Sequence, residues 1–319
     1  MEVKQKIEYT IKQKNRLILI YSICYFGLRL QLCVTNGDDI MDKVIDKNLK
    51  KLLKQEEKLM QQPGGTFMKP LTDKVEDKIP QELYGKLQQA FYVGFKTIFE
   101  KGNSIIEKTY DRDQLILEHE VYDASFAKLN KKKSLKSINK LANKGNLKNM
   151  GISAVEGTGL GLLGVGLPDI PVFIGVVLKS VYEISLSYGY DYREEQEQYF
   201  ILKMIEAALA SDEMKTERNA EVDKLMGFFV DDIPIGYDID LQMRNTADSF
   251  AADMVCIKFI QGLPLVGVIG GPANVLYCKK ISDYAKVKYQ KRYLLEKQKQ
   301  VEQSEQEMQE KARQYMQNK

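Results

Sequence analysis

The sequence is poor in the side chains from which most hydrolytic and metal sites are built. Its 319 residues include one histidine, His119, and four cysteines that form no C-x-x-C pair. Because a structural zinc ion takes four cysteine or histidine ligands, this scarcity excludes an ordinary zinc site. A Ser/His/Asp set would have to use the single histidine, and neither a G-x-S-x-G nor a G-K-[ST] loop is present. The cysteines, Cys24, Cys33, Cys256 and Cys278, are expected to be unpaired thiols in a reducing cytoplasm.

Net charge and strand-like patterns are scarce as well. The 47 basic and 44 acidic residues leave a net charge of +3, so no global field directs the protein to nucleic acid. Hydrophobic residues make up 44% of the chain, which is enough for a sizeable core. They recur at steps of three to four residues, and no hairpin pattern of alternating residues is found. The sequence therefore predicts an all-α fold, a multi-helix bundle.

The first 40 residues differ from the rest. Residues 17–28, LILIYSICYFGL, are apolar but too few to span a bilayer, and no small-x-small cleavage site follows them. A charged amphipathic pattern starts at Met41, and the Gly-Asp-Asp-Ile before it can be encoded by a purine-rich run at ribosome-binding distance. We hypothesise that Met41 is the true start and that residues 1–40 are a non-native or disordered extension.

Three further segments are expected after that extension. They are a charged helix with a linker at 41–79, a helical domain at 80–296 and a charged helical tail at 297–319. The clearest helical pattern opens the domain, where Pro80 occupies a first-turn position. Its apolar residues are Leu83, Leu87, Phe91, Phe95 and Ile98.

A glycine-rich stretch raises the question of nucleotide binding. Residues 157–177, GTGLGLLGVGLPDIPVFIGVV, contain the G-x-G-x-x-G pattern between Gly159 and Gly164. In dinucleotide-binding folds these glycines follow a strand and open a helix that binds the pyrophosphate. Here a lysine-rich helical pattern precedes them, and Pro168 and Pro171 would break the helix. No nucleotide is therefore expected as a ligand.

Two nearly uncharged segments, residues 157–178 and 254–277, reach transmembrane length. Each is interrupted near its middle, by LPDIP at residues 167–171 and by GLP at residues 262–264. Both are therefore predicted to be glycine/proline-broken apolar helical hairpins and not simple spans. Two interpretations stay open: the hairpins are closely packed core helices, or they contact the membrane.

A lysine stripe precedes the first of these segments. The lysines recur every four residues, and no acid occurs between Asp123 and Glu156. A solvated helix face is the usual meaning of such a run, but unbalanced lysines beside an apolar hairpin favour an anionic membrane surface. Nucleic acid is not expected as a partner, because the stripe contains neither aromatic residues nor arginine. The predicted lipid-binding residues are Lys132, Lys136, Lys140, Lys144 and Lys148.

An alternative function, a soluble metal-dependent hydrolase, would use His119, Glu120 and Asp123. Their H-E-x-x-D spacing places the histidine and the aspartate one helical turn apart. The second histidine of the metalloprotease motif is missing, and no strong third ligand is visible. We therefore expect a surface histidine, no metal ion and no other cofactor.

Acidic residues also mark two expected helix starts. Asp169 lies between Pro168 and Pro171, where it is either the N-cap of a helix that begins near Pro171 or a catalytic acid. Asp191 and Glu194 have the spacing of a capping box, which predicts a helix directly after Asp191.

Two regions of the chain carry distinctive motifs. The first is a glycine-rich LPDIP segment that leads to Tyr-Gly-Tyr-Asp, and the second is a G-x-x-x-G-x-x-x-N segment that leads into a helix ending in Arg-Tyr-Leu. These regions resemble the signature regions of the EcsC family. The resemblance covers about residues 80–300, and Pro272 within the second motif predicts that no unbroken helix runs through that motif. The matching motif positions are Gly161, Gly164, Pro168, Asp169, Pro171, Tyr188, Gly189, Asp191, Gly267, Gly271 and Asn274.

The resemblance implies a bacterial protein whose relatives can be encoded beside the ATPase and permease of an ABC exporter, and the family offers no established activity. We therefore expect a cytoplasmic accessory protein, peripheral to or partly inserted in the cytoplasmic membrane. Its partner would be an anionic membrane surface or a membrane protein such as an ABC transporter. A purely structural helical bundle is a further alternative.

Overall fold

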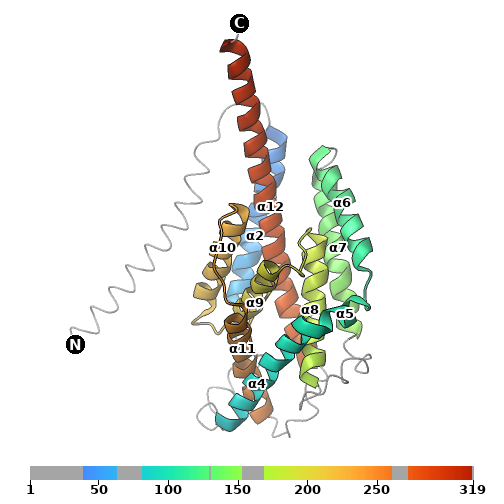
Figure 1. The fold of residues 1–319 in the computed structure, drawn as a ribbon, viewed down its shortest axis with the longest axis vertical. Helices are drawn as coiled ribbons and strands as arrows, with labels where there is room; N and C mark the ends of the chain where they lie inside the picture. Colours follow the sequence, from blue (N-terminus) through green and yellow to red (C-terminus); the bar gives the residue numbers. More distant parts are fainter. Residues whose placement is uncertain (1–38, 63–80, 129–130, 153–168, 261–271, 318–319) are drawn as a thin grey trace, which may run out of the picture. The chain divides into compact units, whose positions relative to one another are not determined.

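The computed structural model describes residues 39–62, 81–128, 131–152, 169–260 and 272–317. These residues form ten α-helices and one π-helical turn, and none of them belongs to a β-strand, which confirms the predicted all-α multi-helix bundle. The elements are α2 (Asp39–Gln61), α4 (Gln81–Thr97), the π-helical turn η2 (Ile98–Gly102), α5 (Asn103–Glu107), α6 (Arg112–Lys128), α7 (Lys131–Ile152), α8 (Asp169–Ser187), α9 (Glu195–Leu209), α10 (Lys215–Val230), α11 (Ile239–Ile260) and α12 (Pro272–Gln317) (Figure 1).

The chain divides into two compact units, Met1–Lys43 and Val44–Lys319. Only residues 39–43 of the first unit are described, as the beginning of α2. The hypothesis that Met41 is the true start therefore stays a prediction. All contacts described below lie within the second unit.

Helix α8 forms much of the core of this unit. It packs against α4, α6, α7 and α12, and nearly all of its side chains from Ile170 onward are buried. An aromatic cluster joins α8 to α4 and α11. The Phe250 ring lies 5.0 Å from the Phe91 ring and 5.6 Å from the Phe173 ring, measured between centroids.

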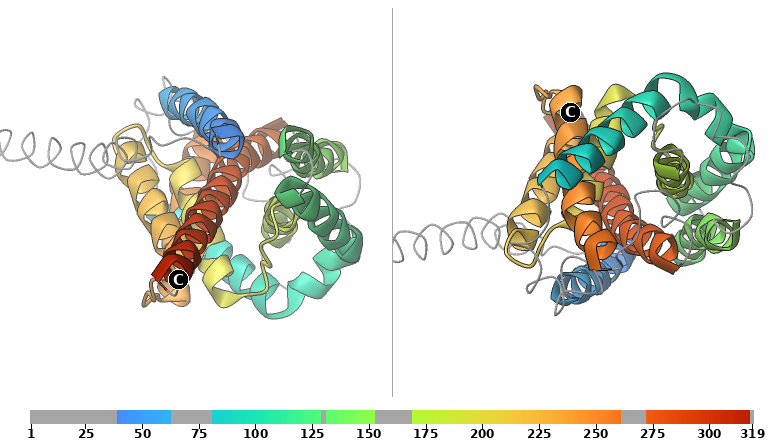
Figure 2. Two further views of the ribbon diagram at one scale, coloured as in Figure 1. Left: turned by 90° about the horizontal axis from the view of Figure 1, so that it is seen from above. Right: turned by 90° about the horizontal axis from the view of Figure 1, so that it is seen from below.

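Helix α12 connects most of the remaining helices. It packs against α7, α8, α9 and α10, as Figures 1 and 2 show. The helix continues through residues 296 and 297 without interruption, and its described side chains are exposed from residue 303 onward. The predicted charged tail is thus the distal part of α12.

Parts of both apolar segments are described. In the first, residues 169–178 belong to α8, and in the second the chain leaves α11 at Ile260 and enters α12 at Pro272. Pro272 therefore opens a helix, where its missing N–H costs nothing. Within the described residues, α8 is the one helix long and apolar enough to cross a membrane, and its burial by neighbouring helices is what a core helix shows. Residues 157–168 and 261–271, which contain the predicted breaks, lie outside the described part.

The start of α9 differs from the prediction. Glu194 is the N-cap residue, and its side chain makes no capping hydrogen bond. The Asp191 carboxylate instead accepts hydrogen bonds from the Arg193 backbone N–H and from the Arg112 guanidinium. The capping box of Asp191 and Glu194 was therefore wrong, because a nearby arginine competes for the aspartate.

Candidate functional site at the end of helix α8

The family-motif residues Tyr188 and Gly189 end helix α8 in a Schellman motif. Gly189 has a φ of +89°, in the left-handed region that favours glycine. Its N–H donates to the Leu186 carbonyl at 3.0 Å, and the Tyr190 N–H donates to the Ser185 carbonyl at 2.9 Å. This pair of bonds defines the motif and uses two of the carbonyls that a helix leaves unpaired.

The single histidine of the chain covers this turn. His119 of α6 donates from Nδ1 to the Ser187 carbonyl at 2.9 Å. A Cβ atom at position 189 would lie 2.4 Å from His119 Nε2, so the imidazole fills the space that the glycine leaves free. Burial lowers the pKa of His119 below its ordinary value. The hydrogen bond to Ser187 and the charge of Asp123 raise the pKa, but burial outweighs them. His119 is therefore a part-buried, neutral packing residue and not the surface histidine that the sequence indicated.

The other residues proposed for a hydrolase do not form a site with His119. The Asp123 carboxylate accepts hydrogen bonds from the Tyr293 hydroxyl at 2.6 Å and from Lys297 Nζ at 2.9 Å. Burial raises the pKa of Asp123, but these two partners outweigh it and hold the pKa below its ordinary value. Glu120 is exposed, and no three metal-ligating side chains gather anywhere in the described ranges. The geometry gives the hydrolase alternative no support.

A tyrosine chain extends from the same turn. Tyr192 stacks on Tyr182 with their centroids 3.8 Å apart, and its hydroxyl donates to Glu107 Oε1 at 2.7 Å. The Tyr110 hydroxyl donates to the Tyr192 hydroxyl at 2.8 Å. Burial is the main reason that the pKa of Tyr192 rises to about 12. Arg193 binds Glu107 through two hydrogen bonds, at 3.0 and 2.8 Å.

These residues border an open depression of about 580 Å³. Its charged lining is balanced, with three cations and three carboxylates, so it favours neither an anion nor a cation. The lining residues are Glu107, Lys108, Thr109, Tyr110, Asp111, Arg112, Asp113 and Arg193.

The predicted lipid-binding lysines lie on a different helix, α7. Lys132, Lys136 and Lys140 are exposed, and none of them forms an ion pair or hydrogen bond with another described residue. The opposite face of α7 is buried through Leu135, Ile138 and Leu141. Lys144 and Lys148 also belong to α7, but their side chains lie outside the described part.

The remaining motif residues are only partly described. Asp169 is the first residue of α8, and Pro171 is buried in the first turn of that helix. Asn274 lies in the first turn of α12. The glycines Gly161, Gly164, Gly267 and Gly271, and Pro168, lie outside the described residues. Among the motif residues that the structure describes, Tyr188, Gly189 and Asp191 thus lie together at the end of α8, beside His119.

Comparison with known proteins decides the family. A family model described as the EcsC protein family matches residues 45–294. The chain belongs to the EcsC family. The match begins inside α2, well before residue 80, where the resemblance was first placed.

Two relatives from Bacillus subtilis (strain 168) are similar to the chain. "Protein EcsC" is 24% identical over 238 residues, which cover 72% of this chain and 87% of that protein. "Uncharacterized protein YdbA" is 27% identical over 156 residues, 46% of this chain and 53% of that protein. No solved structure matches the chain.

A buried ion-pair cluster connects α2, most of which lies inside the EcsC match, with α10 and α12. Lys288 of α12 is completely buried and binds Glu56 of α2 and Asp223 of α10, the latter at 2.6 Å. Lys291 also binds both carboxylates, each at 3.0 Å. Helix α2 thus contacts α10 and α12 through these ion pairs, and its apolar residues Ile45, Leu49 and Leu52 are buried as well.

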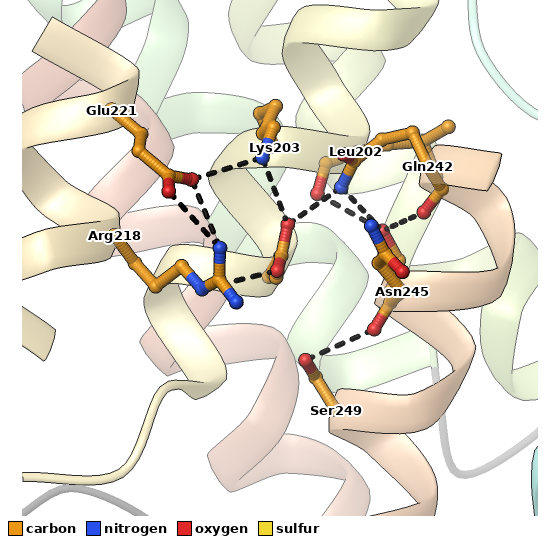
Figure 3. A network of polar contacts seen from close by, with 9 residues as sticks. Leu202, Lys203, Arg218, Glu221, Gln242, Asn245 and Ser249 are labelled. Atoms are coloured by element: carbon orange, nitrogen blue, oxygen red, sulfur yellow. Dashed lines mark hydrogen bonds and ion pairs between the residues drawn. The ribbon is translucent and has the colours of Figure 1, made fainter. Parts of the chain in front are cut away.

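A second polar cluster, built around the buried Glu206 and Gln242, lies between α9, α10 and α11 (Figure 3). At its centre, Glu206 accepts a hydrogen bond from Gln242 Nε2 at 2.7 Å and lies 3.2 Å from Arg218 Nε. Lys203 contacts both Glu206 and Glu221. Sequence reasoning missed both clusters, because a lysine or glutamate in a helical run reads as an exposed residue until its neighbours in space are known.

Proposed function

We propose that this EcsC-family chain is a membrane-associated accessory protein that contacts the anionic cytoplasmic leaflet through the exposed lysines of α7. One observation carries the proposal: Lys132, Lys136 and Lys140 are exposed and pair with no other residue that the structure describes, whereas lysines such as Lys288 and Lys291 are buried in ion pairs. Unpaired lysines on one helix face are free to interact with lipid phosphates.

The expected strength suits reversible attachment. Each lysine near an anionic membrane contributes about 1 kcal/mol, so these three contribute about 3 kcal/mol, or roughly 100-fold in affinity. Salt should weaken the attachment, because the Debye length falls from about 10 Å at 0.1 M to about 3 Å at 1 M.

The test is sedimentation of purified protein with vesicles of phosphatidylcholine, with or without phosphatidylserine. We expect binding only to the anionic vesicles, and loss of binding in the triple variant Lys132→Gln, Lys136→Gln, Lys140→Gln. The matched control changes Lys50, Lys51 and Lys54, three exposed lysines of α2, to glutamine. If both triple variants bind equally well, net charge and not the α7 surface attracts the lipid, and the proposal fails.

The proposed protein partner is a membrane protein such as an ABC transporter. This part of the proposal rests on the family resemblance alone. The test is to crosslink the protein to its neighbours in native membranes, using the triple variant of the α7 lysines and the α2 control variant. The comparison shows whether the α7 surface brings the protein to such a partner. Equal crosslinking in both variants would remove α7 from that contact.

A further inference from the structure

Helix α6, which packs against the lysine-bearing helix α7, exposes two large apolar side chains. Leu117 is 60% exposed and Val121 is 57% exposed, and the two lie one turn apart with Ala124 on the same face. The opposite face of α6 is used in the core, where Phe126 is completely buried. The apolar pair is therefore not part of the packing of this helical unit.

Helices α6 and α7 form an antiparallel pair, with two residues between them. The Ser134 hydroxyl donates to the Ser125 hydroxyl at 2.8 Å, which fixes the level at which the helices meet. At this register, Lys140 of α7 lies level with the α6 segment between Leu117 and Val121. Figures 1 and 2 show the two helices side by side.

The exposed faces of both helices point away from the rest of the unit. On α6, His119 and Asp123 contact the end of α8 and helix α12. On α7, the buried side chains of Leu135, Ile138 and Leu141 form the inner face, and the exposed lysines lie on the opposite face. Asn143, at the edge of the lysine face nearest α12, accepts a hydrogen bond from Lys286. The remaining faces, which carry the apolar pair and the lysines, are therefore both on the outer side of the helix pair.

We propose that α6 and α7 dock on an anionic lipid surface as one unit, with Leu117 and Val121 entering the boundary of the acyl chains. This inference rests on the proposed lipid contact of the lysines. The arrangement matches the chemistry of an interfacial helix surface, in which apolar side chains enter the membrane and lysines lie at the headgroups. The adjacent cations favour an anionic membrane over a neutral apolar partner.

Two exposed acidic residues of α6 oppose this contact: Asp113, one turn before Leu117, and Glu120. Glu120 is exposed and precedes Val121, so an anionic surface would repel it. We expect Glu120→Gln to strengthen binding to phosphatidylserine vesicles about fivefold at low salt, and to have no effect at 1 M salt. An unchanged affinity at low salt would place α6 away from the lipid and overturn the inference.

The sequence contains no tryptophan, which permits a direct test. In Leu117→Trp, the emission of the single tryptophan should shift to shorter wavelength on adding phosphatidylserine vesicles, and brominated lipid should quench it. The matched control is Leu241→Trp on α11, because Leu241 is exposed to a similar extent, 54%. Its emission should not change.

Sedimentation of the same samples separates the two proposals. If Leu117→Trp sediments with the vesicles but its emission is unchanged, the apolar docking is overturned and the lysine contact stands. If the protein does not sediment at all, the lysine contact fails and the apolar docking fails with it. A shift that requires native membrane proteins and not lipid vesicles would assign the apolar pair to a protein partner, which also overturns the inference.

Discussion

Replacement of Gly189 by alanine should destabilise the protein through two separable effects. Alanine at a φ of +89° costs about 1–2 kcal/mol of backbone strain. Its Cβ would also lie 2.4 Å from His119 Nε2, so the imidazole must move and its hydrogen bond to Ser187 is lost, for about 1 kcal/mol more. We expect a loss of about 2–3 kcal/mol in the free energy of unfolding, measured by urea titration.

A double-mutant cycle with His119→Ala tests the second effect. In the His119→Ala background, the Gly189→Ala change should cost only the strain, so the two changes should couple by about 1 kcal/mol. Gly236→Ala is the matched control, because a Cβ at position 236 meets no atom within 4 Å, and its effect should stay within about 0.5 kcal/mol. Strict additivity of His119→Ala and Gly189→Ala would refute the steric part of this account.

Three further predictions concern buried charges and a helix start. Lys288→Met leaves Glu56 and Asp223 without their fully buried partner, so the free energy of unfolding, measured by urea titration, should fall by about 3–5 kcal/mol. The control Lys50→Met, at an exposed site, should lower it by under about 0.5 kcal/mol. Burial raises the pKa of Glu56, but Lys288 and Lys291 lower it to about 2, so its stabilisation is complete above pH 4.5 and is lost as the pH falls toward 2. The Tm should therefore fall more steeply across that window in the wild type than in Glu56→Gln, and equal slopes would contradict the ion pairing. If Asp169, the first residue of α8, only stabilises the start of the helix, Asp169→Asn should cost no more than about 1 kcal/mol; unchanged melting with loss of cellular function would contradict this structural role.

The helices could be predicted from the sequence because their apolar residues are periodic. The residues Leu87, Phe91 and Phe95 recur at four-residue steps, and all three are buried in α4. Leu135, Ile138 and Leu141 are likewise buried on the face of α7 opposite its lysines. A local pattern of this kind needs no knowledge of the partner helix.

The surroundings of the α8 turn could not be predicted in the same way. The Tyr-Gly-Tyr-Asp letters indicated a turn, but His119 lies 70 residues before Gly189, and no local pattern shows that the imidazole covers the glycine. The capping box failed for the same reason, since the competing Arg112 lies 79 residues before Asp191. Contacts between distant segments depend on helix packing, which periodicity does not specify.

The buried charges of α8 also bear on how the protein meets a membrane. Lys179 and Glu183 are both buried, and Lys179 Nζ donates to the Thr109 carbonyl at 3.2 Å. If α8 left the core and crossed a bilayer, a lysine near its centre alone would cost about 2.5–3.5 kcal/mol, and a glutamate one turn away would add to that cost. Insertion would also break the contacts of α8 with α4, α6, α7 and α12.

Docking through α6 and α7 leaves the charges and the helix contacts of α8 in place. We therefore expect α8 to stay in the core when the protein is bound to lipid. Hydrogen exchange measured on vesicle-bound and free protein tests this expectation. The backbone amides of α8 should keep the same protection in both states, because their exchange depends on opening of the core. Faster exchange along α8 in the bound state would show that the helix leaves the core. That result would contradict surface docking and favour insertion of the first apolar segment.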